Sequence, residues 1–366
     1  MKPRDAKQLA EAVRVATTPF EVVGLGTKPT LGNAVKATKL DLSAFNGAIN
    51  YEPEELIFEC GAATKLSVVE KLLAQKNQML AFEPPNFSSL LGSAHAGSVG
   101  GALACNLAGP RRLKAGAARD HILGVTGVNG QGEIIRSGAR VVKNVTGYDV
   151  PRLMAGSFGT LMAFTSVIFK VLPQPETEQT CVMSDHGPAQ AVNDMAEILA
   201  TGAEVSSAAY LPGEGTYLRI EGIEASVKAR VEIVGASKMP RDLLAEKQSK
   251  QLWRALRDVT SLAGHHGKEV WRIVLPPSEA ATFLTRLPFS HRYYLDWAGS
   301  LIWLETDPKS DIRKFLPSGI ATRFTGQSVQ DVFHPLPKEL NALSARVKAA
   351  FDPKGLFNPG KMSRDF

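Results

Sequence analysis

The spacing of hydrophobic residues along the first 82 positions predicts a small α/β unit. Leu9, Val13 and Ala16 recur every three or four residues, as on one side of an amphipathic helix over residues 4–16. A second pattern of this kind predicts a helix over residues 64–75. Short apolar or alternating runs predict strands within residues 20–23, 33–42, 56–61 and 79–82.

Residues 83–170 are the richest in glycine and hold 14 of the chain's 32 glycines. Glycine has no Cβ, so it permits positive φ and lets the backbone come close to a ligand. A small-residue turn at residues 98–106 enters a predicted helix, and Asn129-Gly130 predicts a hairpin between strands at 122–128 and 133–137. A short helix at 152–155 precedes a turn and strand over 159–172. This glycine density favours a backbone shaped around a ligand, and a loop-rich β region is the alternative.

Pro173 and Pro175 interrupt the pattern, and they predict a domain boundary. Beyond it, helix and strand patterns recur in two similar sets, which predicts two related α+β units on one antiparallel sheet, joined by a charged helix over residues 240–258. The first unit has predicted helices at 187–200 and 223–235 and strands at 204–211 and 215–221; the second has strands at 268–275, 291–297, 300–305 and 320–325 and helices at 277–287 and 308–316.

The last segment predicts a helix over residues 337–350, with a buried stripe formed by Leu340, Leu343, Val347 and Ala350. The helix runs into the segment Phe351-Asp352-Pro353-Lys354-Gly355-Leu356-Phe357-Asn358-Pro359-Gly360-Lys361. Its prolines and glycines predict one specific turn that directs Lys361 inward, and a simple helix stop is the alternative. The chain is therefore expected to have three parts, at residues 1–175, 176–330 and 331–366.

Composition limits the classes of protein to consider. Apolar residues make up 44% and charged residues 21% of 366, as in a globular protein. The net charge of +6 is modest, and Arg111-Arg112-Leu113-Lys114 is its one local cluster, so an anionic small molecule or a solvated basic face is expected rather than nucleic acid. The three cysteines form no CxxC pair, which predicts neither disulfides nor an iron–sulfur cluster. The N-terminus lacks a secretory pattern and no apolar run could span a membrane, so a cytoplasmic protein with only peripheral membrane contact is expected.

The loop from Gly24 to Gly32 follows a predicted strand and contains three glycines, Thr27 and Lys28. It is not a dinucleotide fingerprint, because the third glycine comes too late and Pro29 interrupts the loop, and it lacks the GK[ST] of a P-loop. A nest of backbone N–H donors for an anion remains possible, with a plain turn as the alternative.

Four further motifs occur in a fixed order along the chain. They are Leu107-Ala108-Gly109-Pro110-Arg111-Arg112, Val142-Lys143-Asn144-Val145-Thr146-Gly147-Tyr148-Asp149, Gly156-Ser157-Phe158-Gly159-Thr160 with the later Val171-Leu172-Pro173-Gln174-Pro175, and Phe357-Asn358-Pro359-Gly360-Lys361. With this order the chain resembles the vanillyl-alcohol oxidase, or PCMH-type, family of FAD-binding proteins, and within it the GlcE-like FAD-binding subunits of bacterial glycolate oxidase. The resemblance implies an α+β fold: a two-subdomain FAD-binding domain, an α+β cap with an antiparallel sheet, and a C-terminal tail that packs back on the FAD domain.

The same resemblance implies which residues hold FAD. The first glycine loop would wrap the diphosphate, and the later motifs would line the flavin and close the site. The cofactor-binding residues expected from it are Gly24, Gly26, Thr27, Lys28, Gly32, Pro84, Ser98, Gly100, Gly101, Asn106, Gly109, Arg119, Asp120, Gly159, Thr160, Asn358 and Lys361. Because residues 21–33 contain neither His nor Cys, the FAD is expected to be non-covalent, and His95 in the second loop keeps covalent attachment as an alternative.

Catalytic residues are harder to assign. Relatives that oxidise 2-hydroxy acids carry a G-D-G-N-x-H type motif in the cap, which this chain lacks. In the corresponding region Arg323 could grip a carboxylate and His334 could accept the hydroxyl proton. A structural salt bridge and a surface histidine are the alternatives. No histidine pair has metal-ligand spacing, and no metal is expected.

The resemblance implies an FAD-dependent oxidoreductase that acts on CH–OH donors and oxidises glycolate, a small 2-hydroxy acid, to glyoxylate. Its partners would be a sister FAD-binding glycolate oxidase subunit and an iron–sulfur subunit that leads to quinone at the inner membrane. A non-catalytic assembly or electron-relay subunit is the first alternative. A free-standing D-2-hydroxyacid dehydrogenase, such as a D-lactate dehydrogenase, is the second.

Overall fold

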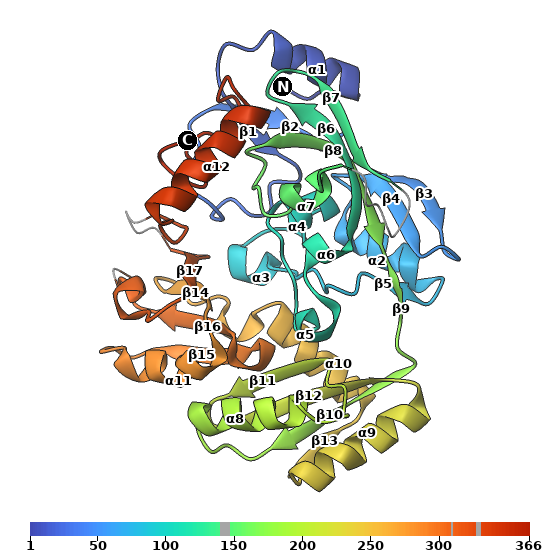
Figure 1. Cartoon of the computed structure of the whole chain (residues 1–366), viewed down its shortest axis with the longest axis vertical. Helices are drawn as coiled ribbons and strands as arrows, with labels where there is room; N and C mark the ends of the chain where they lie inside the picture. The colour runs from blue at the N-terminus through green and yellow to red at the C-terminus, as the bar shows by residue number, and fades with distance from the viewer. Residues whose placement is uncertain (140–146, 309, 327–330) are drawn as a thin grey trace.

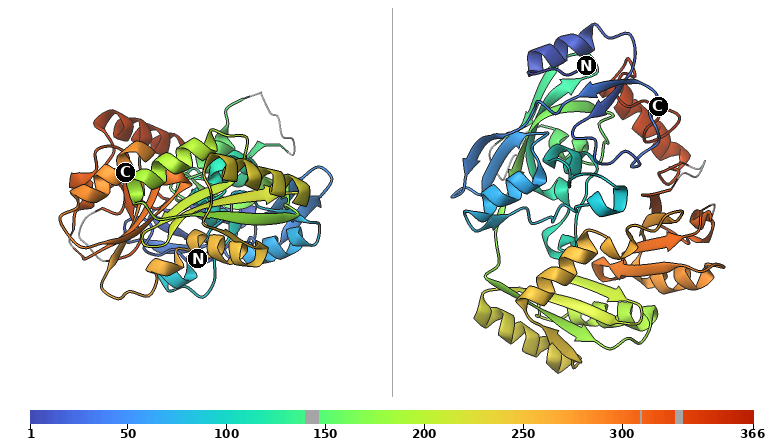
Figure 2. Two further views of the ribbon diagram at one scale, coloured as in Figure 1. Left: turned by 90° about the horizontal axis from the view of Figure 1, so that it is seen from below. Right: turned by 180° about the vertical axis from the view of Figure 1, so that it is seen from behind.

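The computed structural model describes residues 1–139, 147–308, 310–326 and 331–366 (Figure 1). The first 175 residues fold around a five-stranded sheet, and the following segment builds an eight-stranded sheet at the opposite end of the molecule. The C-terminal helix returns to the first part, and the right-hand view of Figure 2 shows both termini there. In the described ranges, no helix has the length and apolar character needed to cross a membrane.

The first part is built on an antiparallel sheet of order β3-β4-β8-β6-β7, with the isolated parallel pair β1-β2 beside it. Its strands are β1 (Phe20–Val23), β2 (Thr38–Asp41), β3 (Ala48–Glu52), β4 (Ile57–Gly61), β6 (Ile122–Asn129), β7 (Ile134–Gly138) and β8 (Met162–Lys170), with β5 (Gln78–Met79) paired to β9 (Leu172–Pro173). Its helices are α1 (Ala6–Arg14), α2 (Leu66–Ala74), α3 (Ser88–Leu91), α4 (Val99–Ala104), α5 (Arg112–Ala115), α6 (Ala118–His121) and α7 (Val150–Met154).

The second part has the two-unit plan that the sequence predicts, on one sheet of order β13-β10-β12-β11-β15-β16-β14-β17. All its strand pairs are antiparallel, and the units join where Tyr210 pairs with Leu295. The strands are β10 (Thr177–Met183), β11 (Ser207–Leu211), β12 (Gly215–Gly222), β13 (Asp242–Leu244), β14 (Glu269–Val274), β15 (Arg292–Asp296), β16 (Leu301–Thr306) and β17 (Ile320–Arg323). The helices are α8 (Pro188–Leu199), α9 (Glu224–Ser237), α10 (Glu246–Arg257) and α11 (Pro277–Arg286), with 3₁₀ turns η1 (Thr260–Leu262), η2 (Trp297–Gly299) and η3 (Ile312–Phe315).

The two faces of this sheet are covered differently, because neighbouring residues of a strand point to opposite sides. Trp271 and Ile273 of β14 join a hydrophobic cluster with residues of α8, α9 and α11. Val270 of the same strand faces the other side, in a cluster that includes Trp253 of α10 and Leu107 of the first part. The second face of the sheet therefore packs against the first part of the chain.

Several predicted elements differ from those observed. The stripe predicted on the C-terminal helix, α12 (Lys338–Phe351), is wrong, because Leu340 and Leu343 are 51% and 52% exposed while Lys348 is only 5% exposed. The helix turns a charged residue inward because Lys348 finds buried hydrogen-bond acceptors there. The helix expected over residues 240–258 begins only after β13, and the helix expected at 308–316 is the single turn η3. The motif residues 142–146 lie outside the described residues.

A buried network of charges joins the two parts of the chain. Glu83 of the first part accepts hydrogen bonds from Arg111 at 2.9 Å and from Arg219 of β12 at 2.9–3.0 Å. Arg111 also reaches across to Glu221, with its Nε 3.0 Å from both carboxylate oxygens. Burial alone would raise the pKa of Glu221, but the charges of Arg219 and Arg111 bring it down to about 2. Two carboxylates and two guanidinium groups therefore balance one another at the junction.

We expect Glu83→Gln to lower the free energy of unfolding by about 3–5 kcal/mol, because it leaves Arg111 and Arg219 buried with too little negative charge. Urea unfolding followed by circular dichroism measures this loss. Glu204→Gln is the matched control, since Glu204 forms its ion pairs with Lys114 and Arg230 from an exposed position, and little change is expected. Equal effects of the two substitutions would show that the network does not stabilise the junction.

Candidate functional site

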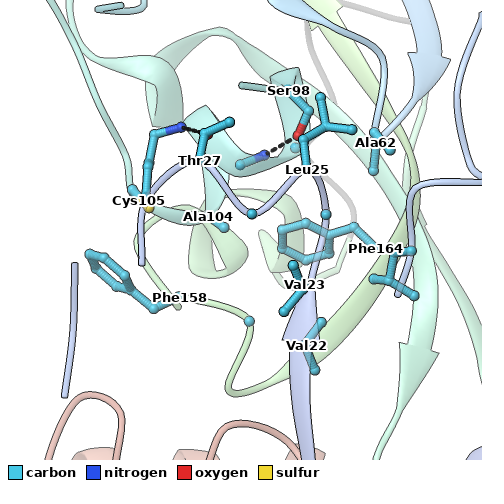
Figure 3. A pocket seen from close by; sticks show the side chains of 18 of the residues that line it. Val22, Val23, Leu25, Thr27, Ala62, Ser98, Ala104, Cys105, Phe158 and Phe164 are labelled. Atoms are coloured by element: carbon cyan, nitrogen blue, oxygen red, sulfur yellow. Dashed lines mark hydrogen bonds between the residues drawn. The ribbon is translucent and has the colours of Figure 1, made fainter. Parts of the chain in front are cut away.

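A cavity of about 300 Å³ lies where the first glycine loop meets helix α4 and the C-terminal tail. Figure 3 shows side chains of β1, the following loop, α4 and the segment at Phe158 around the same space. Nine of the predicted cofactor-binding residues line this cavity although they come from four separate segments: Gly24, Gly26, Thr27, Lys28, Ser98, Gly100, Gly101, Gly159 and Lys361. Leu31, Cys105 and Phe158 also line it and were not predicted from the sequence.

Glycines allow the two loops of this cavity to cross closely. Gly97 has a φ of +101°, and a Cβ there would lie 2.5 Å from Thr27 Oγ1 and 2.7 Å from Lys28 Nζ. Gly101 follows in α4, where its N–H donates to Ser98 Oγ at 3.2 Å. A Cβ on Gly101 would lie 3.2 Å from that oxygen and 3.8 Å from Lys28 Nζ. Any side chain at position 101 would therefore occupy space beside the lysine.

Two partly buried lysines line the cavity without an ion-pair partner among the described residues. Lys28 Nζ has only weak neutral contacts, at 3.4 Å to Thr27 Oγ1 and 3.5 Å to the Ala96 carbonyl. Burial lowers the pKa of Lys28, and the Cys105 thiol opposes this shift in part. Burial also lowers the pKa of Lys361, against smaller opposing effects of Cys105 and Glu21. Two ammonium groups without a carboxylate partner, beside two loops whose backbones cross closely, fit the diphosphate of a dinucleotide.

The C-terminal tail ties two walls of the cavity together through Asn358. Its side-chain oxygen accepts a hydrogen bond from the Val22 N–H of β1 at 2.8 Å. Its side-chain nitrogen donates to the carbonyls of Phe158 and Gly159 at 2.8 and 3.3 Å. Asn358 does not itself line the cavity, so the structure gives it a role in positioning β1 and the segment 158–159.

A buried ion pair holds this tail in turn. Lys348 of α12 pairs with Asp352 and donates to the carbonyls of Thr160 and Phe357 at 2.7 Å. Asp352 accepts hydrogen bonds from the N–H groups of Leu356 and Phe357 at 2.9 and 2.7 Å. The sequence analysis missed both charged residues. Their only signal is the (i, i+4) spacing of Lys348 and Asp352, which is equally typical of exposed helix pairs.

The other predicted cofactor-binding residues do not line the cavity. Thr160 is buried next to the Lys348 amine, and Gly32 packs against Lys361, where a Cβ would come 2.8 Å from its Cγ. Pro84 is buried next to Glu83, and a Cβ on Gly109 would lie 2.7 Å from the Glu83 Cβ. In the remaining group, Asn106 accepts a hydrogen bond from the Arg119 N–H and Asp120 accepts one from the Ala117 N–H.

The structure does not bring Arg323 and His334 to the glycine-rich cavity. Arg323 is buried on β17 and pairs with Glu269 at 3.4 Å, and it borders a second cavity together with Thr30 and Gly32. His334 Nδ1 accepts a hydrogen bond from the Ala321 N–H at 3.4 Å and borders another cavity. Arg323 thus has a salt-bridge partner and His334 is half-buried, and the catalytic roles expected of both residues remain predictions.

Comparison with known proteins agrees with this geometry. Residues 1–138 match the family model described as an FAD binding domain, and residues 336–362 match the C-terminal domain of FAD linked oxidases. The glycolate oxidase subunit GlcE of Escherichia coli is 35% identical over 352 residues, which cover 94% of this chain and 93% of that protein. The subunit GlcD of Bacillus subtilis is 36% identical over 40% of this chain and 32% of its own length.

Among solved structures, an alkyldihydroxyacetonephosphate synthase superposes with a TM-score of 0.69 at 14% identity, covering 99% of this chain and 77% of the synthase chain. This likeness, together with the match to the FAD binding domain, confirms the predicted α+β fold with a PCMH-type FAD-binding domain. The family matches also confirm FAD as the cofactor. The individual cofactor-binding residues and non-covalent attachment remain predictions.

We expect Gly101→Val to abolish FAD binding while leaving the protein folded, because the added side chain fills space beside Lys28 and Ser98. Flavin absorbance per protein chain after reconstitution with FAD measures the loss, and thermal unfolding of the apoprotein checks the fold. Gly235→Val is the matched control, since a Cβ at that position of α9 would meet nothing within 4 Å. Full FAD content in Gly101→Val would remove Gly101 from the site.

We expect Lys28→Met to have opposite effects on apoprotein stability and on FAD affinity. Because burial holds the pKa of Lys28 below its usual value, its charge destabilises the apoprotein at pH 7, and methionine removes that cost. The lost charge-assisted contact should weaken FAD binding by roughly 10- to 150-fold. Thermal unfolding and titration with FAD measure the two effects, with Lys76→Met at an exposed position as control. Unchanged FAD affinity would place the diphosphate elsewhere.

Proposed function

Because the chain belongs to the GlcE family of FAD-binding glycolate oxidase subunits, we propose that it is the FAD-binding subunit of a glycolate dehydrogenase complex. As a member of this family it is an FAD-linked oxidoreductase. The proposed reaction oxidises glycolate to glyoxylate, and the proposed partners are a sister FAD-binding subunit and an iron–sulfur subunit that passes electrons to quinone. We place this complex peripherally at the inner membrane, held there by its partners.

The observation that carries the proposal is the cavity with two lysines that lack counter-charges. Lys28 and Lys361 would hold the diphosphate of FAD, with backbone N–H groups of the first glycine loop and of α4 as further donors. Phe158 and Leu31 would form the apolar wall that excludes water from the site. Asn358 would keep both walls in place from behind. Bound FAD supplies the two-electron acceptor that the oxidation of an alcohol requires.

Electrons need a route out of the chain. An iron–sulfur cluster takes four cysteine ligands in its common forms, whereas this chain has three cysteines in all. Cys60 and Cys181 are buried in the cores of different parts of the molecule, and Cys105 lines the cavity. We therefore assign onward transfer to a separate iron–sulfur subunit.

A non-catalytic assembly or electron-relay subunit is the second candidate. It is favoured by the absence of the G-D-G-N-x-H motif and by the ion pair that Arg323 forms with Glu269. In this alternative the sister subunit takes the hydride, and this chain binds FAD as a relay or supports the assembly. A free-standing D-2-hydroxyacid dehydrogenase, for which D-lactate would be the substrate, is a third candidate.

Anaerobic reduction separates these functions. The purified chain is loaded with FAD, mixed with glycolate or D-lactate, and followed at the flavin absorbance band, first alone and then with its co-purified partners. We expect bleaching by glycolate when the partners are present. Bleaching by D-lactate without any partner would support the free-standing dehydrogenase. A complex that bleaches equally well with a chain made FAD-free by Gly101→Val would support the assembly function.

A further inference from the structure

Two arginines lie against one tryptophan at the junction of the two parts of the chain. The guanidinium carbon of Arg112 is 4.5 Å from the ring centroid of Trp297, and that of Arg272 is 5.0 Å from it. Arg112 begins α5 of the first part, whereas Arg272 lies on β14 with its side chain on the same face as Val270, toward the first part. Trp297 is anchored to the first part of the chain by a hydrogen bond from its Nε1 to the Gly109 carbonyl at 3.0 Å.

The two guanidinium groups lack the counter-charges that their neighbours have. Arg111 and Arg219 are paired with Glu83 and Glu221, so those carboxylates are already used. In the described parts of the chain, neither Arg112 nor Arg272 forms an ion pair. Burial lowers the pKa of Arg272 to about 10, and the charge of Arg112 adds to this effect. The pair is thus a concentration of positive charge in a poorly solvated place.

Asp296 and Asp120 are the acidic residues that act on this pair, and neither neutralises it. Asp296 accepts a hydrogen bond from the Trp297 N–H at 2.7 Å, and burial raises its pKa to about 7; among the described residues it forms no ion pair with Arg112 or Arg272. Asp120 acts on Arg112 from a distance and accepts a hydrogen bond from the Ala117 N–H. The positive charge at Trp297 therefore remains available to a ligand.

The backbone at this place is also strained. Trp297 and Ala298 have φ of +51° and +54°, in the left-handed region that residues with a side chain rarely occupy. Consecutive non-glycine residues in this region cost free energy and persist where the surrounding structure holds them, as at ligand-binding sites. The surrounding structure therefore holds the indole ring in place between the first part and the sheet.

We propose that Arg112 and Arg272, held beside Trp297, bind the carboxylate of a small organic acid. Guanidinium groups offer paired N–H donors that match the two oxygens of a carboxylate, and one such anion would relieve the repulsion between the two arginines. Trp297 belongs to the same hydrophobic cluster as Leu31, a residue that lines the glycine-rich cavity. That the acid is a 2-hydroxy acid such as glycolate rests on the proposed function.

Calorimetric titration of the FAD-loaded chain with oxalate tests the site. Oxalate has two carboxylates and no C–H bond to oxidise, so its binding is measured without turnover. We expect Arg112→Met and Arg272→Met each to weaken oxalate binding about tenfold or more, and Arg272→Lys to weaken it less, with flavin content unchanged. Arg346→Met, at an exposed position of α12, is the control.

Intrinsic fluorescence gives a second readout, because an anion held by these arginines should alter Trp297 emission, and this change should be lost in Trp297→Phe. Oxalate affinity that is the same in all arginine variants would overturn the proposal, as would inorganic phosphate binding as tightly as oxalate. If Arg272→Met does not fold, Arg112→Met and Arg272→Lys still decide. Oxalate binding that depends on both arginines, in a chain that glycolate never bleaches, would leave this site standing while the proposed function fails.

Discussion

The C-terminal turn is the constraint on which the proposed FAD site depends. Strand β1 pairs only with β2 among the described strands, and the five-stranded sheet does not hold it. Strand β1 is held by the bridge between Phe20 and Phe357 and by the hydrogen bonds of Asn358, which link β1 to the segment at Phe158. The Lys348–Asp352 pair stabilises that turn at the C-terminal end of α12. Since the glycine loop starts at the end of β1, a cavity that belongs to the first part of the chain is closed by its last residues.

The distribution of charge separates structural contacts from binding sites in this molecule. At the junction, Glu83 and Glu221 face Arg111 and Arg219, so the charges cancel and the pairs serve stability. In the cavity proposed to bind FAD, Lys28 and Lys361 face no carboxylate within ion-pair distance among the described residues, and an incoming diphosphate would supply the missing charge. A buried charge without a partner is costly to the folded state, so its presence is best explained by a ligand that completes it.

Much of the fold follows from the spacing of hydrophobic residues, because the apolar residues of α8 and α11 recur at a clear helical period. For α12 the helical period gave a wrong prediction. Leu340 and Leu343 have the spacing of a buried stripe, but Lys348 is buried instead, because it donates hydrogen bonds to the carbonyls of Thr160 and Phe357. The convergence of residues near 26, 101, 159 and 361 on one cavity came from family resemblance, since spacing along the chain carries no information about such distant contacts. Phe158 and Cys105 were missed because neither residue type stands out in a glycine-rich segment.

Arg111 and Arg112 show how far a local motif can be interpreted. Both belong to one basic cluster that predicted an anionic ligand, yet Arg111 turns to Glu83 and Glu221 while Arg112 turns to Trp297. The difference arises from the cap, which offers the Glu221 carboxylate on β12 to the first side chain and the Trp297 indole after β15 to the second. Of these two adjacent arginines, Arg111 therefore joins the two parts of the chain, whereas Arg112 has no ion-pair partner among the described residues. Because residues from the cap sheet set the contacts of each arginine, the partners of both arginines could be found only from the three-dimensional structure.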